Sequence, residues 1–155
     1  MKSRLLTPLA ALTAAAPLAF GTAPSAHATS GTALAICPRG SGVTVIVDFG
    51  SWDKRSCAPG DPTTGLAALR GAGFTVTMVQ RFPGAVCRIN GRPSATVDKC
   101  VVMPPTTGYW SYWHAVRGGK WTYSTSGPGS YNPKPGTVEG WSYGAGKPPT
   151  APPPA

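Results

Sequence analysis

Aromatic side chains gather in one short stretch of this sequence, residues 109–114 (YWSYWH), followed closely by residues 120–123 (KWTY). Three of the five Trp and three of the five Tyr fall between positions 109 and 123. Flat rings stack on a flat apolar ligand such as a macrocycle or a sugar, and the Tyr hydroxyl and Trp N–H add a polar handle. The stretch therefore predicts either part of a core or a surface that grips a ligand.

The histidine in this stretch is the other group whose chemistry could matter. Apart from His27 near the N-terminus, His114 is the only histidine. A single imidazole could bind a metal ion, but without a second protein ligand it is more often a hydrogen-bonded strand residue. Asp48 and Glu139 have no carboxylate neighbour that would suggest acid–base catalysis. With no nucleophile motif, phosphate loop or metal-ligand set, the sequence predicts a protein that is not an enzyme and uses no metal or cofactor.

A β-hairpin has to position these aromatic residues. Two glycines at 118–119 are a typical hairpin turn, which would place Val116 opposite Trp121 and His114 opposite Tyr123. Side chains alternate along a strand, so this register predicts two aromatic faces, at least one of them core. One face would carry Trp110, Tyr112, His114, Val116, Trp121 and Tyr123, and the other Tyr109, Ser111, Trp113 and Ala115.

The rest of the chain predicts an α+β fold, with one short helix laid across a mixed sheet. Residues 43–49 (VTVIVDF) are apolar and β-branched, which is typical of a central strand buried on both faces. Thr63 or Thr64 caps a helix that Gly71 and Gly73 end. Further strands are expected at 55–58, 74–79, 86–89 and 138–143.

The cysteine count indicates a disulfide framework, because an even number in a small exported domain is usually paired. The four residues are Cys37, Cys57, Cys87 and Cys100, and three connectivities are possible. A local bridge from Cys87 to Cys100 across a loop-rich segment is favoured. That choice leaves Cys37 to pair with Cys57, on either side of one strand.

The two ends of the chain differ in composition from the middle. Residues 1–28 combine Lys2, Arg4, an apolar run and a final AHA, which predicts a secretory signal peptide rather than a membrane span. The domain would then occupy residues 29–144, outside the cell and not inserted in a membrane. Residues 145–155 hold five prolines in their last eight positions, which predicts an extended, disordered tail.

The charge of the chain limits its partners. The formal net charge is +9, and removal of Lys2 and Arg4 leaves 12 basic and 5 acidic residues, or 12 − 5 = +7. The basic residues are scattered, with no run longer than two and no nucleic-acid-binding motif. We therefore expect no nucleic-acid partner, and a basic exported protein that sits near an anionic cell wall.

Several of these segments together resemble the transcobalamin-like C-terminal domain family, in its short secreted actinobacterial type. The matching features are the strand at 43–49, TGLAAL at 64–69, AGF at 72–74, YWSYWHA at 109–115 and GTVEGW at 136–141. The resemblance implies a β-grasp-like fold and a non-catalytic ligand-binding domain. In family members with a helical-barrel domain, this domain closes over one side of a corrinoid. This sequence has no such barrel, so a second protein chain would complete the site.

The matched positions imply that Trp110 and Tyr112 belong to the core, and Trp141 in the last strand is expected there too. Four residues of the aromatic stretch then remain as candidate ligand-binding residues: Trp113, His114, Trp121 and Tyr123. The predicted function is a secreted binding module for a small flat ligand such as a corrinoid, or for a partner that holds one.

Two other functions remain open from the residues alone. A small, basic, disulfide-bonded exported domain often inhibits proteases with a rigid loop, here residues 82–84 (FPG) or the Cys87–Cys100 loop with Arg92 and Pro93. The third is a structural domain of the cell envelope that binds no small ligand.

Overall fold

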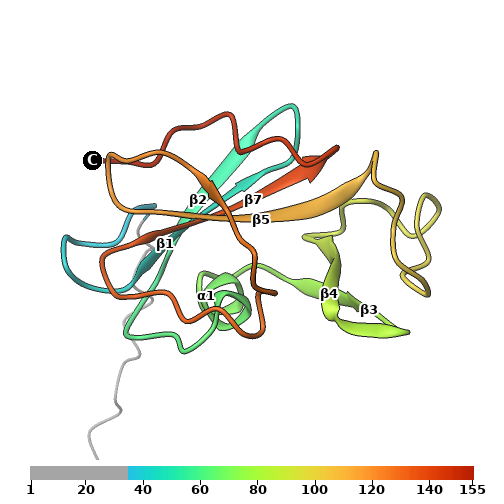
Figure 1. Ribbon diagram of the computed structural model, residues 1–155, viewed down its shortest axis with the longest axis horizontal. Helices are drawn as coiled ribbons and strands as arrows, with labels where there is room; N and C mark the ends of the chain where they lie inside the picture. Colours follow the sequence, from blue (N-terminus) through green and yellow to red (C-terminus); the bar gives the residue numbers. More distant parts are fainter. Residues whose placement is uncertain (1–34) are drawn as a thin grey trace, which may run out of the picture. The chain divides into compact units, whose positions relative to one another are not determined.

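A mixed β-sheet with one short helix organises residues 35–155, the part of the chain that the computed structural model describes. The predicted signal peptide, residues 1–28, lies outside the described residues. In chain order the elements are β1 (Val43–Asp48), β2 (Asp53–Ala58), α1 (Gly65–Gly71), β3 (Val76–Val79), β4 (Phe82–Ile89), β5 (Tyr109–Ala115), β6 (Thr122–Tyr123) and β7 (Val138–Gly144). The α+β class is confirmed (Figure 1).

Five strands form the main sheet in the order β2-β1-β7-β5-β6, and β3 pairs with β4 in a separate hairpin. Strands β1 and β7 run parallel, and the other pairs of the main sheet are antiparallel. All six residues of β1 are buried, which confirms the expectation of a strand covered on both faces.

Helix α1 covers one face of this sheet, which we call the helix face. The side chain of Thr64 caps the helix by accepting a hydrogen bond from the amide of Ala67 at 3.0 Å. Buried residues of the helix and of the sheet then form the main core: Val43, Val45, Val47, Phe49, Ala68, Leu69, Trp110, Tyr112 and Trp141. The prediction that Trp110, Tyr112 and Trp141 are core residues is confirmed. Among residues 35–155, no helix is long and apolar enough to cross a membrane.

The opposite face, which we call the tail face, is covered by the proline-rich residues 145–155, which we call the tail segment. As predicted, this segment forms neither helix nor strand. The prediction of disorder is wrong, because Ala151 packs with Ile46 and Val138, and Thr150 bonds to Asp48. Proline cannot donate a ladder hydrogen bond, but an extended proline-rich segment still offers carbonyls and apolar rings to a surface that fits it.

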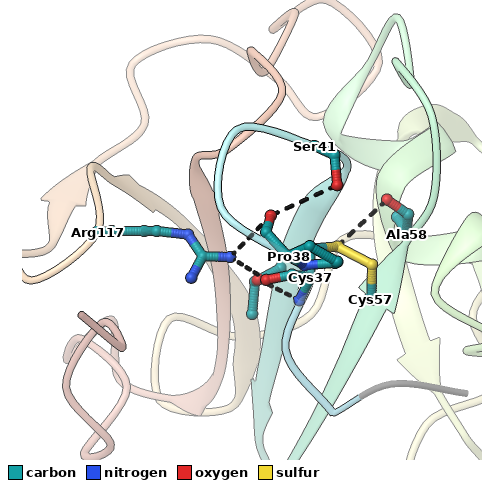
Figure 2. The surroundings of a disulfide bond; sticks show 7 residues. Cys37, Pro38, Ser41, Cys57, Ala58 and Arg117 are labelled. Atoms are coloured by element: carbon teal, nitrogen blue, oxygen red, sulfur yellow. Dashed lines mark hydrogen bonds between the residues drawn. A yellow bond between two sulfur atoms is a disulfide. The ribbon is translucent and has the colours of Figure 1, made fainter.

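Both predicted disulfides are present, Cys37–Cys57 and Cys87–Cys100. The first joins the segment before β1 to β2 and lies beside Arg117, as Figure 2 shows. The Arg117 guanidinium donates to the carbonyl of Cys37 and, at 3.5 Å, to that of Pro38. The bridge therefore fastens the segment before β1 to β2, and the Arg117 hydrogen bonds fasten the same segment to the loop after β5.

Candidate functional site

Strand β5 carries the aromatic stretch and alternates as predicted, but its partner β6 is shifted by one residue. Trp113 lies opposite Tyr123 and His114 opposite Thr122, whereas the expected partner of His114 was Tyr123. The amide of Gly119 bonds to the carbonyl of Val116 at 3.0 Å, and the loop then runs on through residue 121 before β6 begins. A one-residue shift moves a side chain to the other face of the sheet.

This shift separates His114 from Trp121 and Tyr123, which the predicted register had placed on the same face. His114 is on the helix face, where its ring stacks on Tyr131 with centroids 4.5 Å apart. Burial lowers the pKa of His114. Trp113, Trp121 and Tyr123 belong to the tail face, against the prediction that Trp121 and Tyr123 share a face with Trp110 and Tyr112.

Their exposure differs as well. Trp121 is half-buried under the tail segment and donates its indole N–H to the carbonyl of Ala151 at 2.9 Å. Trp113 is also half-buried and meets Tyr123 edge to face, with centroids 5.0 Å apart. Tyr123 is 46% exposed, and its side-chain hydrogen bond with Tyr109 raises its pKa. The predicted stacking surface is thus largely closed, with Tyr123 as its open part.

A pocket that the sequence did not predict lies where β4, β5 and the loop after β6 meet. Its volume is about 540 Å³. The core aromatic residues Trp110, Tyr112 and Trp141 contribute to its lining, and the rest comes from Gly84, Ala85, Val86, Met103, Pro104, Thr106, Tyr109 and residues 123–128. Met103 and the residues around Gly127 come from loops without a sequence motif, so only their packing in three dimensions reveals them.

The aromatic part of this lining is held in place by its neighbours. Trp110 donates its indole N–H to the carbonyl of Arg92 at 3.0 Å. The rings of Tyr112 and Trp141 lie 4.7 Å apart and are tilted by 30°. Such contacts fix the ring planes before any ligand arrives, and a preorganised pocket loses less entropy on binding.

The only Glu of the chain lies just behind this pocket. Glu139 is fully buried on the helix face and accepts a hydrogen bond from the hydroxyl of Tyr112. Burial raises the pKa of Glu139 to about 8, although the bond from Tyr112 acts to lower it. Burial, together with the nearby Glu139, also raises the pKa of Tyr112. Two buried atoms on β7, Glu139 Oε1 and Trp141 Nε1, have no hydrogen-bond partner among the described residues.

Within residues 35–155, one group of side chains has the composition of a metal site, namely Cys87, Asp98 and Cys100. Both sulfur atoms belong to the second disulfide, and a metal ion binds the thiolate form of cysteine. The oxidised chain therefore offers only the Asp98 carboxylate at this position.

Comparison with known proteins gives one match. The family described as the SCO2322-like domain matches residues 105–153, which is 49 of the 155 residues. No curated protein matches the chain, and no solved structure does. The matched range contains β5, β6, β7 and most of the tail segment. The similarity thus covers the aromatic stretch and the segment that packs on it.

A second, smaller pocket of about 360 Å³ lies beside the loop after β4. Arg92, Pro93, Val97 and Tyr143 are among its lining residues. The Arg92 guanidinium lies over the ring of Tyr143, 5.3 Å from its centroid. This contact holds the arginine against its own sheet.

Proposed function

We propose that this protein is a non-catalytic binding module that holds one small, flat, apolar ligand in the 540 Å³ pocket. The observation that carries the proposal is the aromatic lining formed by Trp110, Tyr112 and Trp141. Small-molecule sites are usually clefts of about 300–1,000 Å³ lined by apolar and aromatic side chains. The volume and the lining of this pocket both fall within that description.

The corrinoid version of this proposal rests on the resemblance to the transcobalamin-like family. A pocket of this volume holds a single drug-sized ligand, so a larger macrocycle would enter with one edge. The remainder of the macrocycle would then be held by a second protein chain. Titration with cobinamide, followed by tryptophan emission and corrin absorbance, tests whether this chain binds a corrinoid alone.

The broader proposal is tested with a probe that does not depend on corrinoids. N-phenyl-1-naphthylamine is flat and apolar, and its fluorescence rises in apolar sites. Gly84 and Gly127 line the pocket, and a Cβ atom on either would meet no other atom within 4 Å. The double variant Gly84→Leu/Gly127→Leu should therefore fill the pocket without straining the backbone, and weaken probe binding about tenfold or more.

Gly129→Leu is the matched control, because Gly129 also has open space around it and does not line the pocket. The control should bind the probe as the wild type does. Saturable binding that is equal in the pocket variant and the control would contradict the proposal, and so would no saturable binding by the wild type.

We further propose that the protein works outside the cell. The support is the signal-peptide pattern at residues 1–28 and the two disulfides, which form and persist in oxidising compartments. N-terminal sequencing of the secreted form should give a start near Thr29. An intact Met1 on the exported protein would contradict this.

Protease inhibition is a second candidate function. Phe82 at the start of β4 is 51% exposed, in the FPG segment considered for this role. Exposed large apolar side chains of this kind contribute to contacts with other proteins. Unchanged activity of trypsin-like and subtilisin-like proteases in a tenfold excess of the protein would exclude this function.

A further inference from the structure

The tail segment packs on the tail face in a regular way. Along residues 148–153, the odd-numbered positions 149, 151 and 153 are buried and the even-numbered positions are exposed. This alternation is that of an extended chain lying flat on a surface, with every second side chain turned inward. The side chains that face the sheet are therefore those of Pro149, Ala151 and Pro153.

The hydrogen bonds to this segment suit a proline-rich chain. Trp121 donates its indole N–H to the carbonyl of Ala151 at 2.9 Å, and Gly118 donates its amide to the carbonyl of Pro154 at 3.0 Å. Asp48 accepts from both the amide and the hydroxyl of Thr150, each at 2.8 Å. Proline has no N–H, so the protein supplies donors to the carbonyls of the segment, and the Asp48 carboxylate accepts from Thr150, a residue that does have an amide.

The sheet beneath the segment leaves room for it at Gly140. A Cβ atom on Gly140 would lie 2.7 Å from the ring of Trp121 and 3.0 Å from Cγ of Pro149. Only glycine at position 140 therefore allows Trp121 and Pro149 to pack on the sheet together. Next to them, the methyl group of Ala151 fits against Ile46, Val138 and Trp121, with 7% of the residue exposed.

We propose that the tail face is a recognition site for extended proline-rich segments. The chain's own residues 147–155 occupy the site in cis, and a proline-rich segment of another protein chain takes their place when they leave. An aromatic ring that stacks on proline and donates to a carbonyl is a general way in which proteins recognise such segments. The residues that form hydrogen bonds with this segment do not line the pocket, so the proposal does not depend on the function proposed for the pocket.

The connection between β7 and the segment allows such an exchange. It runs through residues 144–146, where Gly144 and Gly146 have φ angles of +149° and +76°. Glycine adopts these angles without strain and has no side chain to fix the connection. A short link gives a cis segment an effective concentration of about 1 mM, so the segment outcompetes a free peptide until a substitution weakens its packing.

The test uses the full chain and a fluorescent peptide of residues 145–155 (AGKPPTAPPPA). The variant Ala151→Glu places a charged side chain at a buried position and should expel the chain's own segment. We expect this variant to bind the peptide at least about tenfold more tightly than the wild type, as measured by fluorescence anisotropy. Thr150→Ala, which removes one hydrogen bond to Asp48, is a milder release variant that should give a smaller gain.

Pro152→Glu is the matched control, since it adds the same charge one residue away at an exposed position. It should bind the peptide no better than the wild type. Adding Trp121→Phe to Ala151→Glu keeps a ring but removes the donor, and should abolish the gain. Equal peptide affinity for Ala151→Glu and Pro152→Glu, or a gain that survives Trp121→Phe, would overturn the proposal.

Discussion

The hydroxyl of Tyr112 on β5 donates a hydrogen bond to the carboxyl group of Glu139 on β7, and both side chains are buried. Tyr112 also lines the pocket, so the bond connects the pocket to the centre of the sheet. The ring of Tyr131 packs against Tyr112 with centroids 6.0 Å apart, and His114 stacks on the same Tyr131. A polar cluster within an aromatic core makes the stability of the fold depend on pH.

The first prediction is that the free energy of unfolding falls as the pH rises toward 8. Burial raises the pKa of Glu139 from 4.5 to about 8. Between these values the folded chain holds a proton that the unfolded chain releases, so stability is greatest below the unfolded pKa and is lost as the pH rises through the folded one. The slope should reach about 1.4 kcal/mol per pH unit.

The window from about pH 6.5 to about pH 8 isolates this effect. Burial lowers the pKa of His114 from 6.5. The contribution of His114 to the free energy of unfolding is therefore lost as the pH falls, at pH values below this window. Urea denaturation of the wild type and of Glu139→Gln should show a slope only in the wild type. Parallel stability curves for the two proteins would contradict the assignment to Glu139.

The second prediction concerns the two glycines at the ends of α1, which should respond to alanine in opposite directions. A Cβ atom on Gly65 would collide with the hydroxyl group of Tyr112 and lie 3.1 Å from Oε2 of Glu139. Gly65→Ala should therefore destabilise the fold by about 1–3 kcal/mol through overpacking, although alanine favours helices.

Gly71 is the internal control for this helix. A Cβ atom there would meet Cβ of Ala58 at 3.6 Å, an ordinary contact. Gly71→Ala should stabilise the fold by about 0.4–1 kcal/mol by restricting the unfolded chain. Thermal or urea unfolding of both variants provides the measurement, and changes of the same sign would contradict the packing argument for Gly65.

The features that the sequence predicted correctly depend on local chemistry. Thr64 caps α1 because its hydroxyl group reaches an amide three residues on. Strand β1 is recognisable because a short, unbroken run of β-branched residues is typical of a buried strand. The bridge from Cys87 to Cys100 closes a short loop, and the assignment of the other bridge followed from it.

The features that the sequence missed depend on contacts between distant residues. The loop from Val116 to Trp121 could turn at two positions that differ by one residue, and the choice moves Tyr123 to the other face. Docking of the tail segment needs Asp48, which precedes Thr150 by 102 positions. The pocket needs Met103 and Gly127 to converge on Trp110, and nothing in the composition of those loops indicates that they meet.

The third prediction concerns the disulfide beside Arg117. Replacing both cysteines of the Cys37–Cys57 bridge with alanine should lower the free energy of unfolding by about 2–4 kcal/mol, chiefly because the unfolded chain is released. Arg117→Gln should cost about 1 kcal/mol, since it weakens the donation to the carbonyl of Cys37. In denaturant titrations, the cost of Arg117→Gln should shrink when the bridge is absent. Full additivity of the two changes would show that they do not support the same segment.

The fourth prediction concerns the exposed tryptophan, Trp52. Its ring stacks on Phe49 with centroids 4.0 Å apart, yet Trp52 is 53% exposed and Phe49 is 1% exposed. Trp52→Ala should cost about 0.5–1.5 kcal/mol, the value of an aromatic pair, because one face of the indole is already in solvent. Phe49→Ala should cost about 3–5 kcal/mol, because it empties a filled site beside Trp110. Urea denaturation separates the two cases. A loss at Trp52 as large as the loss at Phe49 would mean that the indole packs more tightly in solution than its exposed face indicates.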